Sequence, residues 1–338
     1  MLAAGKTITL RFHSGLLASR SRSKRAAESL NRQRDRALRS VDPGITSRSG
    51  RHAVSIHPLA AVSPEARLGL GVKIGAFASV EADVELGDHC AVASGAVIKS
   101  GVTAGSHNEI CEHAVIGGAP QHVARPADVG RVIIGDHNVF REHVTVHRGL
   151  KPGCDTVVGS SNYVMAGAHF GHDSVVGNSC IFANGSMLGG HVQIEDKAFV
   201  SGAVAVHQFC RIGHLAMVGG HARVTQDIPP YMLVDGQSGC IVGLNVVGLR
   251  RSGHTAEDIA DLKNAYRIIY RRGLSWQEVL ETLRTEFRAG PVLHVRDFLG
   301  SGKRGFTQER RAPPNATLRL RVADDAPAVA ATLRAKAG

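Results

Sequence analysis

The 338-residue sequence predicts a mainly β protein, with a parallel β-helix over residues 51–230 and a small α-helical domain over residues 231–306. Two observations lead to this prediction. A hydrophobic residue recurs every six positions through the middle of the chain, and 39 glycines accompany an aromatic content of only 4%. Both features fit stacked β-structure whose interior is filled by branched aliphatic side chains.

The six-residue period begins at Ile56 and keeps its phase across two interruptions. Neither a 3.6-residue helical period nor the alternation of a strand predicts such a recurrence. Glycine often follows the periodic residue, which suits a tight corner. The repeat resembles that of left-handed β-helices, in which three hexads form one triangular coil, and the handedness is taken from this resemblance. All members except Ala104 are Ile, Val, Leu or Phe: Ile56, Val62, Leu68, Ile74, Val80, Leu86, Val92, Ile98, Ala104, Ile110, Ile116, Ile134, Phe140, Val146, Val158, Val164, Phe170, Val176, Phe182, Leu188, Ile194, Val200, Val206, Ile212, Val218 and Val224.

The interruptions, residues 117–133 and 148–157, read as loops that leave the coils intact, because the period resumes in phase after each. Long loops on a rigid scaffold often contact substrate. Pro229-Pro230 ends the repeat. Beyond it, helices are expected to begin at Thr255 and at Ser275, where Ser275 and Glu278 form a capping box.

The two ends of the chain differ from the middle in composition. Residues 1–50 are rich in Arg and Ser and are expected to be disordered, as either an organellar transit peptide or a dispensable bacterial leader. Residues 307–338 are expected to form a flexible tail.

Composition excludes several classes of function. Residues 1–50 hold eleven Lys and Arg residues against Glu28, Asp35 and Asp42, so most of the net charge of +11 lies there and the body lacks the basic surface of a nucleic-acid-binding protein. The six cysteines form no C-x-x-C pair, which argues against a zinc knuckle. No apolar stretch is long enough for a membrane span.

In coils of eighteen residues, side chains eighteen apart stack in one column. His172, Gly190 and Gln208 then share a column, and Asp173 stacks with His191. A neutral imidazole beside a carboxylate can act as a general base. Glycine N–H groups one coil away could stabilise an oxyanion.

A third set of polar residues falls beside these two columns. Gly171, Gly189 and His207 form the neighbouring column, which His147 joins once the second loop is skipped, and His169 lies just before the same corner. The sequence therefore predicts a cluster of histidines around one carboxylate.

Several motifs resemble the acyl-acyl carrier protein (acyl-ACP):UDP-N-acetylglucosamine O-acyltransferases that begin lipid A synthesis. The similarity covers about residues 51–306. It rests on Val144-Thr145-Val146-His147-Arg148-Gly149, Ala166-Gly167-Ala168-His169-Phe170-Gly171-His172-Asp173, Leu188-Gly189-Gly190-His191, Val206-His207-Gln208-Phe209, Asp227-Ile228-Pro229-Pro230-Tyr231 and Asn245-Val246-Val247-Gly248-Leu249-Arg250-Arg251.

This resemblance implies a reaction and a site. A 3-hydroxyacyl chain would pass from the phosphopantetheine arm of ACP to the 3-hydroxyl of UDP-N-acetylglucosamine, with no metal and no further cofactor, in a homotrimer of the bacterial cytoplasm. His172 would be the base, Asp173 its orienter and Gly190 the oxyanion donor. The implied substrate contacts are His147, His169, His191, His207, Gln208, Asn245, Arg251 and, as the limit on acyl length, Gly220.

One loop departs from the family pattern. The family usually reads Pro-Gln-Asp-x-Lys, whereas this chain reads Pro120-Gln121-His122-Val123-Ala124, so an acid and a lysine expected to contact the sugar are missing. Two alternatives stay open, the first because of this departure and the second because of the clustered histidines. The acceptor could be a 3-amino variant of the sugar, or the histidines could hold zinc in a metal lyase similar to the γ-class carbonic anhydrases.

Overall fold

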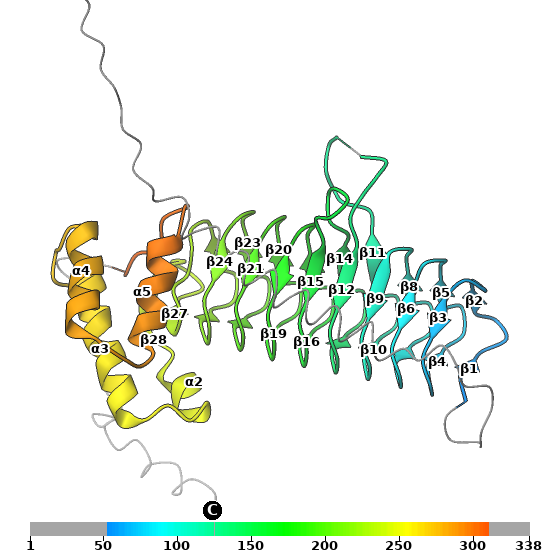
Figure 1. Cartoon of the computed structure of the whole chain (residues 1–338), viewed down its shortest axis with the longest axis horizontal. Helices are drawn as coiled ribbons and strands as arrows, with labels where there is room; N and C mark the ends of the chain where they lie inside the picture. Colours follow the sequence, from blue (N-terminus) through cyan, green and yellow to red (C-terminus); the bar gives the residue numbers. More distant parts are fainter. Residues whose placement is uncertain (1–52, 125, 311–338) are drawn as a thin grey trace, which may run out of the picture.

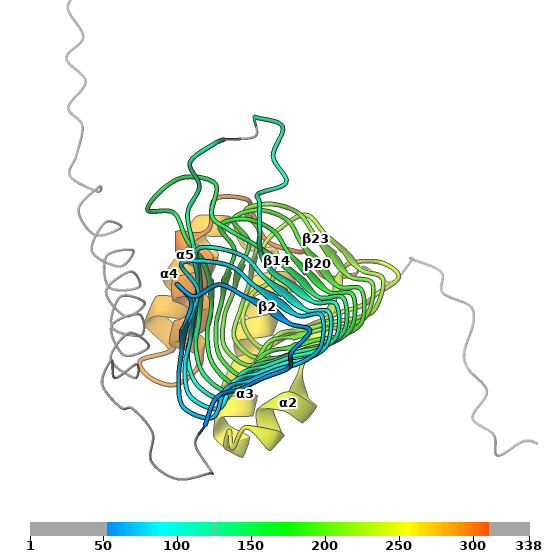
Figure 2. The same ribbon diagram turned by 90° about the vertical axis from the view of Figure 1, so that its right-hand side faces the viewer.

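The computed structural model describes residues 53–124 and 126–310, and these form a triangular prism with helices at one end (Figure 1). The predictions for residues 1–50 and for residues 311–338 lie outside the described residues. Figure 2, which looks along the prism, shows its three flat sides. The predicted parallel β-helix is confirmed.

Each side of the prism is one sheet of short strands, and each coil contributes one strand to each sheet. The first sheet has eleven strands: β1 (Ser55–Ile56), β4 (Lys73–Ile74), β7 (Ala91–Val92), β10 (Glu109–Ile110), β13 (Val139–Phe140), β16 (Tyr163–Val164), β19 (Ile181–Phe182), β22 (Phe199–Val200), β25 (Met217–Val218), β27 (Met232–Val234) and β28 (Ile241–Leu244).

The other two sheets are built in the same way. The second sheet contains β2 (Ala61–Val62), β5 (Ser79–Val80), β8 (Val97–Ile98), β11 (Val115–Gly118), β14 (Thr145–His147), β17 (His169–Phe170), β20 (Met187–Leu188), β23 (Ala205–Val206) and β26 (Arg223–Val224). The third contains β3 (Arg67–Leu68), β6 (Glu85–Leu86), β9 (Val102–Ala104), β12 (Val132–Ile134), β15 (Thr156–Val158), β18 (Val175–Val176), β21 (Gln193–Ile194) and β24 (Arg211–Ile212).

The strand register follows the predicted spacing. Phe170 pairs with Leu188 and Leu188 with Val206, each eighteen residues on. The periodic side chains fill the prism, and the largest of them, including Phe140, Phe170 and Phe182, are fully buried. Burial of this continuous apolar column along the axis is the main force that holds the coils together.

Both predicted loops are observed, and both leave the prism where the second sheet turns into the third. We call these turns the second corner, comprising residues 171–174, 189–192 and 207–210 together with the two loops, 118–131 and 148–155. The loops support each other at their bases, because Arg148 N–H donates to the Gly118 carbonyl at 2.9 Å and Gly130 N–H to the Gly149 carbonyl at 2.8 Å. They project from the prism in Figure 1 beside β11 and β14.

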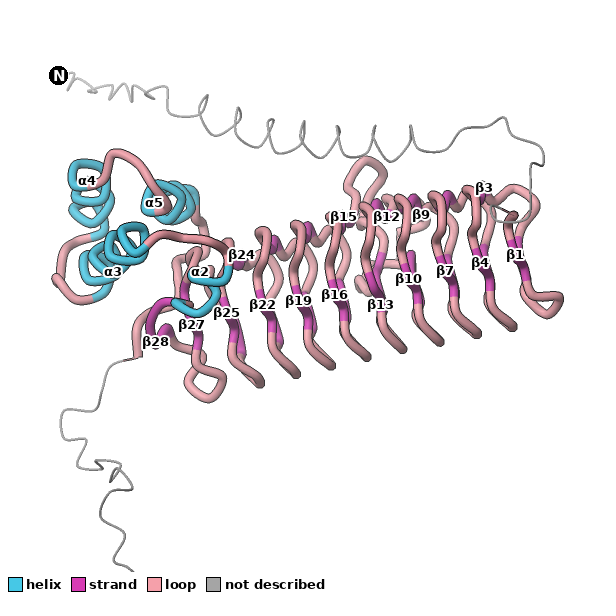
Figure 3. Tube along the Cα trace, turned by 90° about the horizontal axis from the view of Figure 1, so that it is seen from below, coloured by secondary structure: helices cyan, strands magenta, loops and turns pink. Residues whose placement is uncertain are grey.

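The helical end comprises α2 (Val246–Arg251), α3 (Ala256–Tyr270), α4 (Trp276–Glu286) and α5 (Val292–Ser301), packed at one end of the prism (Figure 3). Both expected helix starts are confirmed. Thr255 and Ser275 each form a capping box, with Asp258 and Glu278 respectively. Within the described residues, no helix is both long and apolar enough to cross a membrane.

Two predicted boundaries differ from the structure. The sheet continues past residue 230, because β27 still pairs in parallel with β25 and β28 then folds back against β27. Residues 307–310, expected to belong to the tail, lie against the last coil, where Ile241 N–H donates to the Gln308 carbonyl and Arg310 N–H to the Ile241 carbonyl, each at 2.8 Å. Backbone pairing of this kind needs no hydrophobic period, so the sequence pattern did not reveal it.

Candidate active site

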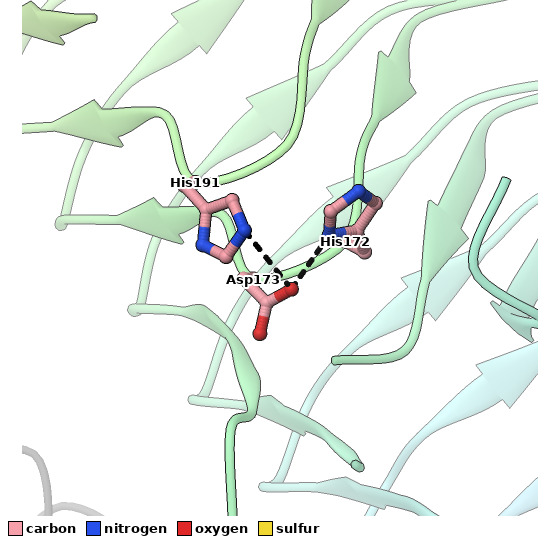
Figure 4. A group of neighbouring side chains, drawn as sticks. All are labelled: His172, Asp173 and His191. Atoms are coloured by element: carbon pink, nitrogen blue, oxygen red, sulfur yellow. Dashed lines mark hydrogen bonds and ion pairs between the residues drawn. The ribbon is translucent and has the colours of Figure 1, made fainter. Parts of the chain in front are cut away.

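His172 and Asp173 occupy the second corner directly after β17, and His191 lies one coil further on (Figure 4). The His172 Nδ1 atom is 2.6 Å from Asp173 Oδ2, and His191 Nε2 is 3.7 Å from the same oxygen. His172 and Asp173 are buried, whereas His191 is partly exposed and stacks on the ring of Phe209. The predicted convergence of these side chains is therefore observed.

Asp173 is positioned by the two coils around it. Its backbone has φ 59°, and its N–H donates to Thr156 Oγ1 at 2.8 Å. Leu150, in the second loop, donates its N–H to Asp173 Oδ2 at 3.1 Å. A carboxylate that accepts a hydrogen bond from an imidazole N–H fixes the histidine tautomer. His172 Nε2 is thereby left free to accept a proton.

Gly190 lies against the imidazole of His172. A Cβ atom added at Gly190 would stand 2.7 Å from His172 Nε2, a separation that real Cβ atoms do not adopt. Among the described residues, no atom accepts a hydrogen bond from the Gly190 N–H. An unpaired N–H beside the free nitrogen of a base is suited to an oxyanion that forms there.

His147 and His169 form a second pair beside the base. Their rings meet edge to face at 4.9 Å, and His169 Nδ1 lies 2.8 Å from Thr145 Oγ1. Burial, together with the nearby His169 and His172, lowers the pKa of His147 to about 4, and burial also lowers the pKa of His169. Both are thus neutral near pH 7 and can hydrogen-bond a substrate without carrying charge.

The pKa of His191 is lowered as well. Burial is the largest cause, and the nearby His172 and His122 act in the same direction, while Asp173 opposes them. The acid therefore serves His172 more than His191, which agrees with the two distances to Asp173 Oδ2.

A cleft of about 510 Å³ lies along the second corner, and of these side chains it is lined by His147, His169 and His172. Its walls come from the first loop, from β17, β20 and β23, and from the turns that follow them. Of the residues singled out from the sequence, the cleft contains His147, His169, His172, Gly190, His207 and Gln208.

Three residues singled out from the sequence lie elsewhere. Asn245 caps α2, accepting from Gly248 N–H at 3.0 Å and donating to the Leu215 carbonyl at 2.9 Å. Arg251 is an exposed residue at the end of the same helix. Gly220 follows β25 at a different corner of the prism. None of the three lines the cleft within one described chain.

His122 was not among the site residues predicted from the sequence, although it stands where the motif departs from the family pattern. The first loop brings its ring to 5.8 Å from that of His172, edge to face, and His122 lines the cleft. The only signal in the sequence was the departure from the family pattern at this position.

The structure also bears on the alternative zinc site. Ligand atoms of His172, Asp173 and His191 lie within 4.8 Å of one another. However, the 2.6 Å between His172 Nδ1 and Asp173 Oδ2 is a hydrogen-bond distance. Two ligands at about 2.0 Å from one tetrahedral zinc ion stand roughly 3.3 Å apart. The arrangement therefore favours acid–base chemistry.

Comparison with known proteins gives a consistent result. Residues 65–100 and 155–190 match the bacterial transferase hexapeptide (six repeats) model, and residues 227–307 match domain 2 of UDP N-acetylglucosamine O-acyltransferase. The acyl-ACP–UDP-N-acetylglucosamine O-acyltransferase of Ectopseudomonas mendocina is 45% identical over 256 residues, 75% of this chain and 99% of the relative. That of Halorhodospira halophila is 44% identical over 253 residues, 74% and 98% of the two chains.

Solved structures agree with the sequence relatives. The UDP-N-acetylglucosamine acyltransferase of Bacteroides fragilis superposes with a TM-score of 0.73 at 38% identity, covering 75% of this chain and all of that one. The Arabidopsis enzyme superposes with a TM-score of 0.65 at 34% identity, again over 75% of this chain and all of the other. The chain therefore belongs to the family of acyl-ACP–UDP-N-acetylglucosamine O-acyltransferases.

Proposed function

We propose that this chain transfers a 3-hydroxyacyl group from ACP to the 3-hydroxyl of UDP-N-acetylglucosamine, the first step of lipid A synthesis. One observation carries the proposal. His172 is bonded through Nδ1 to a buried carboxylate, and its free Nε2 faces Gly190, whose N–H is unpaired among the described residues. The names of the relatives supply the two substrates.

The reaction follows from this arrangement. His172 Nε2 takes the proton of the sugar hydroxyl as its oxygen attacks the thioester carbon, and Asp173 stabilises the imidazolium. The Gly190 N–H donates to the oxyanion of the tetrahedral intermediate. When the carbon–sulfur bond breaks, His172 returns the proton to the departing thiolate of the phosphopantetheine arm, which leaves as the thiol. The acyl donor brings its own reactive group, so this route requires no metal or additional cofactor.

Substrate contacts are assigned by position. His147, His169, His207 and Gln208 line the cleft and are proposed to contact the nucleotide sugar or the acyl arm, and His191 to complete the wall beside Asp173. Asn245, Arg251 and Gly220 are proposed to act in the assembled protein, where a neighbouring copy would bring them to the cleft.

We propose a homotrimer as the active assembly. Two large apolar side chains at the cleft support contact with another copy: Met187 is 45% exposed and Phe209 is 50% exposed. Sedimentation velocity should give a particle three times the chain mass. A monomer at micromolar concentration with full activity would contradict this proposal.

The cellular setting is proposed from the bacterial relatives, which favour the cytoplasm. The alternative is an organellar setting, if residues 1–50 are a transit peptide.

The direct test uses purified protein, 3-hydroxyacyl-ACP and UDP-N-acetylglucosamine, with product measured by mass spectrometry. Transfer to the 3-oxygen is expected. His172→Ala should abolish the transfer, while the far-ultraviolet circular dichroism spectrum and the oligomeric state remain unchanged. A 3-amino sugar nucleotide tested in parallel decides between the two acceptors. Faster transfer to the amine would overturn the hydroxyl assignment.

A further inference from the structure

The first loop places a histidine opposite the base. His122 stands 5.8 Å from the ring of His172, edge to face, and lines the same cleft. His122 also lies close enough to His191 to contribute to the lowered pKa of His191, after burial and His172. It is the one imidazole of the cleft that comes from a loop rather than from a coil of the prism.

The loop fixes which ring nitrogen of His122 is available. The Ala124 N–H donates to His122 Nδ1 at 3.2 Å, and the His122 N–H donates to the Pro120 carbonyl at 2.9 Å. Because Nδ1 accepts a hydrogen bond, the proton of the neutral ring lies on Nε2. Nε2 is therefore a donor, and no described atom accepts from it.

The distance from the base indicates what such a donor can reach. A hydroxyl bonded to His172 Nε2 lies about 2.8 Å from that nitrogen. The oxygen substituents on the neighbouring ring carbons of a sugar stand at a similar distance from that hydroxyl. A donor in the facing loop can therefore reach one of these substituents.

We propose that His122 binds the acceptor sugar directly. Its Nε2 donates a hydrogen bond to an oxygen on a ring carbon adjacent to the carbon that carries the reacting hydroxyl. This inference rests on the proposed function and deepens it. The loop of this chain then selects sugars that present a hydrogen-bond acceptor at that position. A carboxylate in the same place would instead select sugars that present a hydrogen-bond donor there.

The decisive variant is His122→Asn. The Asn Oδ1 atom can take the place of Nδ1 and keep the bond from the Ala124 N–H, whereas the side chain is too short to reach the sugar. The control is His57→Ala. His57 accepts from the Leu59 N–H through Nδ1 at 3.1 Å, the same local bond on an exposed turn, but in the first coil and far from the cleft along the chain.

Binding of UDP-N-acetylglucosamine and of UDP is measured by calorimetry, and steady-state kinetics give KM for both substrates. Loss of one hydrogen bond should weaken UDP-N-acetylglucosamine roughly 3- to 10-fold in His122→Asn. The affinity for UDP and the KM for acyl-ACP should not change. His57→Ala should match the unmodified chain throughout.

Three results would overturn the inference. Unchanged sugar binding in His122→Asn would mean that His122 only supports its loop. Equal weakening of UDP would place the contact at the diphosphate. Each of these leaves the proposed function standing if the unmodified chain is active. Failure of the unmodified chain to bind UDP-N-acetylglucosamine would overturn the proposed function, and this inference with it.

Discussion

Two corners of the prism carry histidine and aspartate side by side, but in opposite order. At the third corner, where the third sheet turns into the first (residues 87–90, 105–108 and 135–138), Asp136 precedes His137. The Asp136 carboxylate accepts the Ser106 N–H of the preceding coil at 2.7 Å. The ring of His137 points outward and stacks on that of His107 at 4.7 Å.

At the second corner, His172 comes first and Asp173 second. The carboxylate is then buried and orients an imidazole, while it also accepts the Leu150 N–H from the loop of the preceding coil. The column that holds carboxylates at the third corner holds Gly190 here, and its N–H stays unpaired among the described residues. The order of histidine and aspartate in the turn thus decides whether the carboxylate only caps the backbone of the preceding coil or also orients the imidazole of the base.

Replacing the histidine at each corner by glutamine should give the largest difference in activity between the two corners. His172→Gln removes the proton acceptor, so kcat should fall roughly 10²- to 10⁴-fold. His137→Gln changes an exposed stacked ring and should leave kcat unchanged. Initial rates of acyl transfer measure both, and equal losses would mean that the corners do not differ in function.

Adding one methyl group at the second corner should have the next largest effect. Gly190→Ala puts a carbon 2.6 to 2.7 Å from the His172 ring, which must move together with the oxyanion donor. We expect a loss in kcat of about 10²-fold, the usual effect of disturbing one such donor. In Gly202→Ala the nearest atom is 3.4 Å away, so that variant should keep its activity. Thermal unfolding would show whether the first variant remains folded.

Matched changes of the two carboxylates should give smaller effects of different kinds. Asp173→Asn leaves His172 in place but no longer fixes its tautomer, so kcat should fall roughly 10- to 100-fold. Asp136→Asn keeps an acceptor for Ser106, so the free energy of unfolding should fall by less than about 1 kcal/mol, with activity intact. Kinetics and urea unfolding on both variants make the comparison. A purely structural loss in Asp173→Asn would contradict the orienting role.

Acidification should lower the stability of the folded chain through His147. The pKa of His147 is about 4 in the folded chain against 6.5 for an ordinary histidine. Below pH 6.5 the unfolded state therefore binds a proton that the folded state does not, and stability falls as pH falls. The contribution of His147 is about 1 kcal/mol between pH 7.5 and pH 6. Urea unfolding at both pH values should show this drop, and His147→Gln should reduce it.

The coils of the prism could be predicted because the six-residue hydrophobic period determines their register. A spacing of eighteen residues placed Asp173 beside His191, and their side chains are 3.7 Å apart. The same arithmetic pairs His89 with His107, whose rings stack at 5.1 Å, although the sequence analysis did not use this signal. Wherever the six-residue period holds, the residues that are neighbours in adjacent coils are found by counting eighteen positions along the sequence.

Features outside the period could not be predicted. The path of the first loop depends on bonds such as that from the Ala124 N–H to His122, so nothing in the pattern places His122 against His172. Residues 307–310 return to the last coil through backbone pairing alone. Asn245 resembles a ligand contact by motif, but within one chain its side chain caps a helix.

The phase-preserving stack of coils has a consequence for how this protein can change its length. Each coil contacts mainly its two neighbours, so one eighteen-residue unit can be gained or lost as a module without repacking the others. Such an edit near β4 would shorten or lengthen the prism and leave the reaction untouched. The same edit between β20 and β23 would move Gln208 one strand spacing, about 4.8 Å, from Gly190. The tolerance of the protein to gain or loss of one coil therefore depends on where along the prism axis that coil lies.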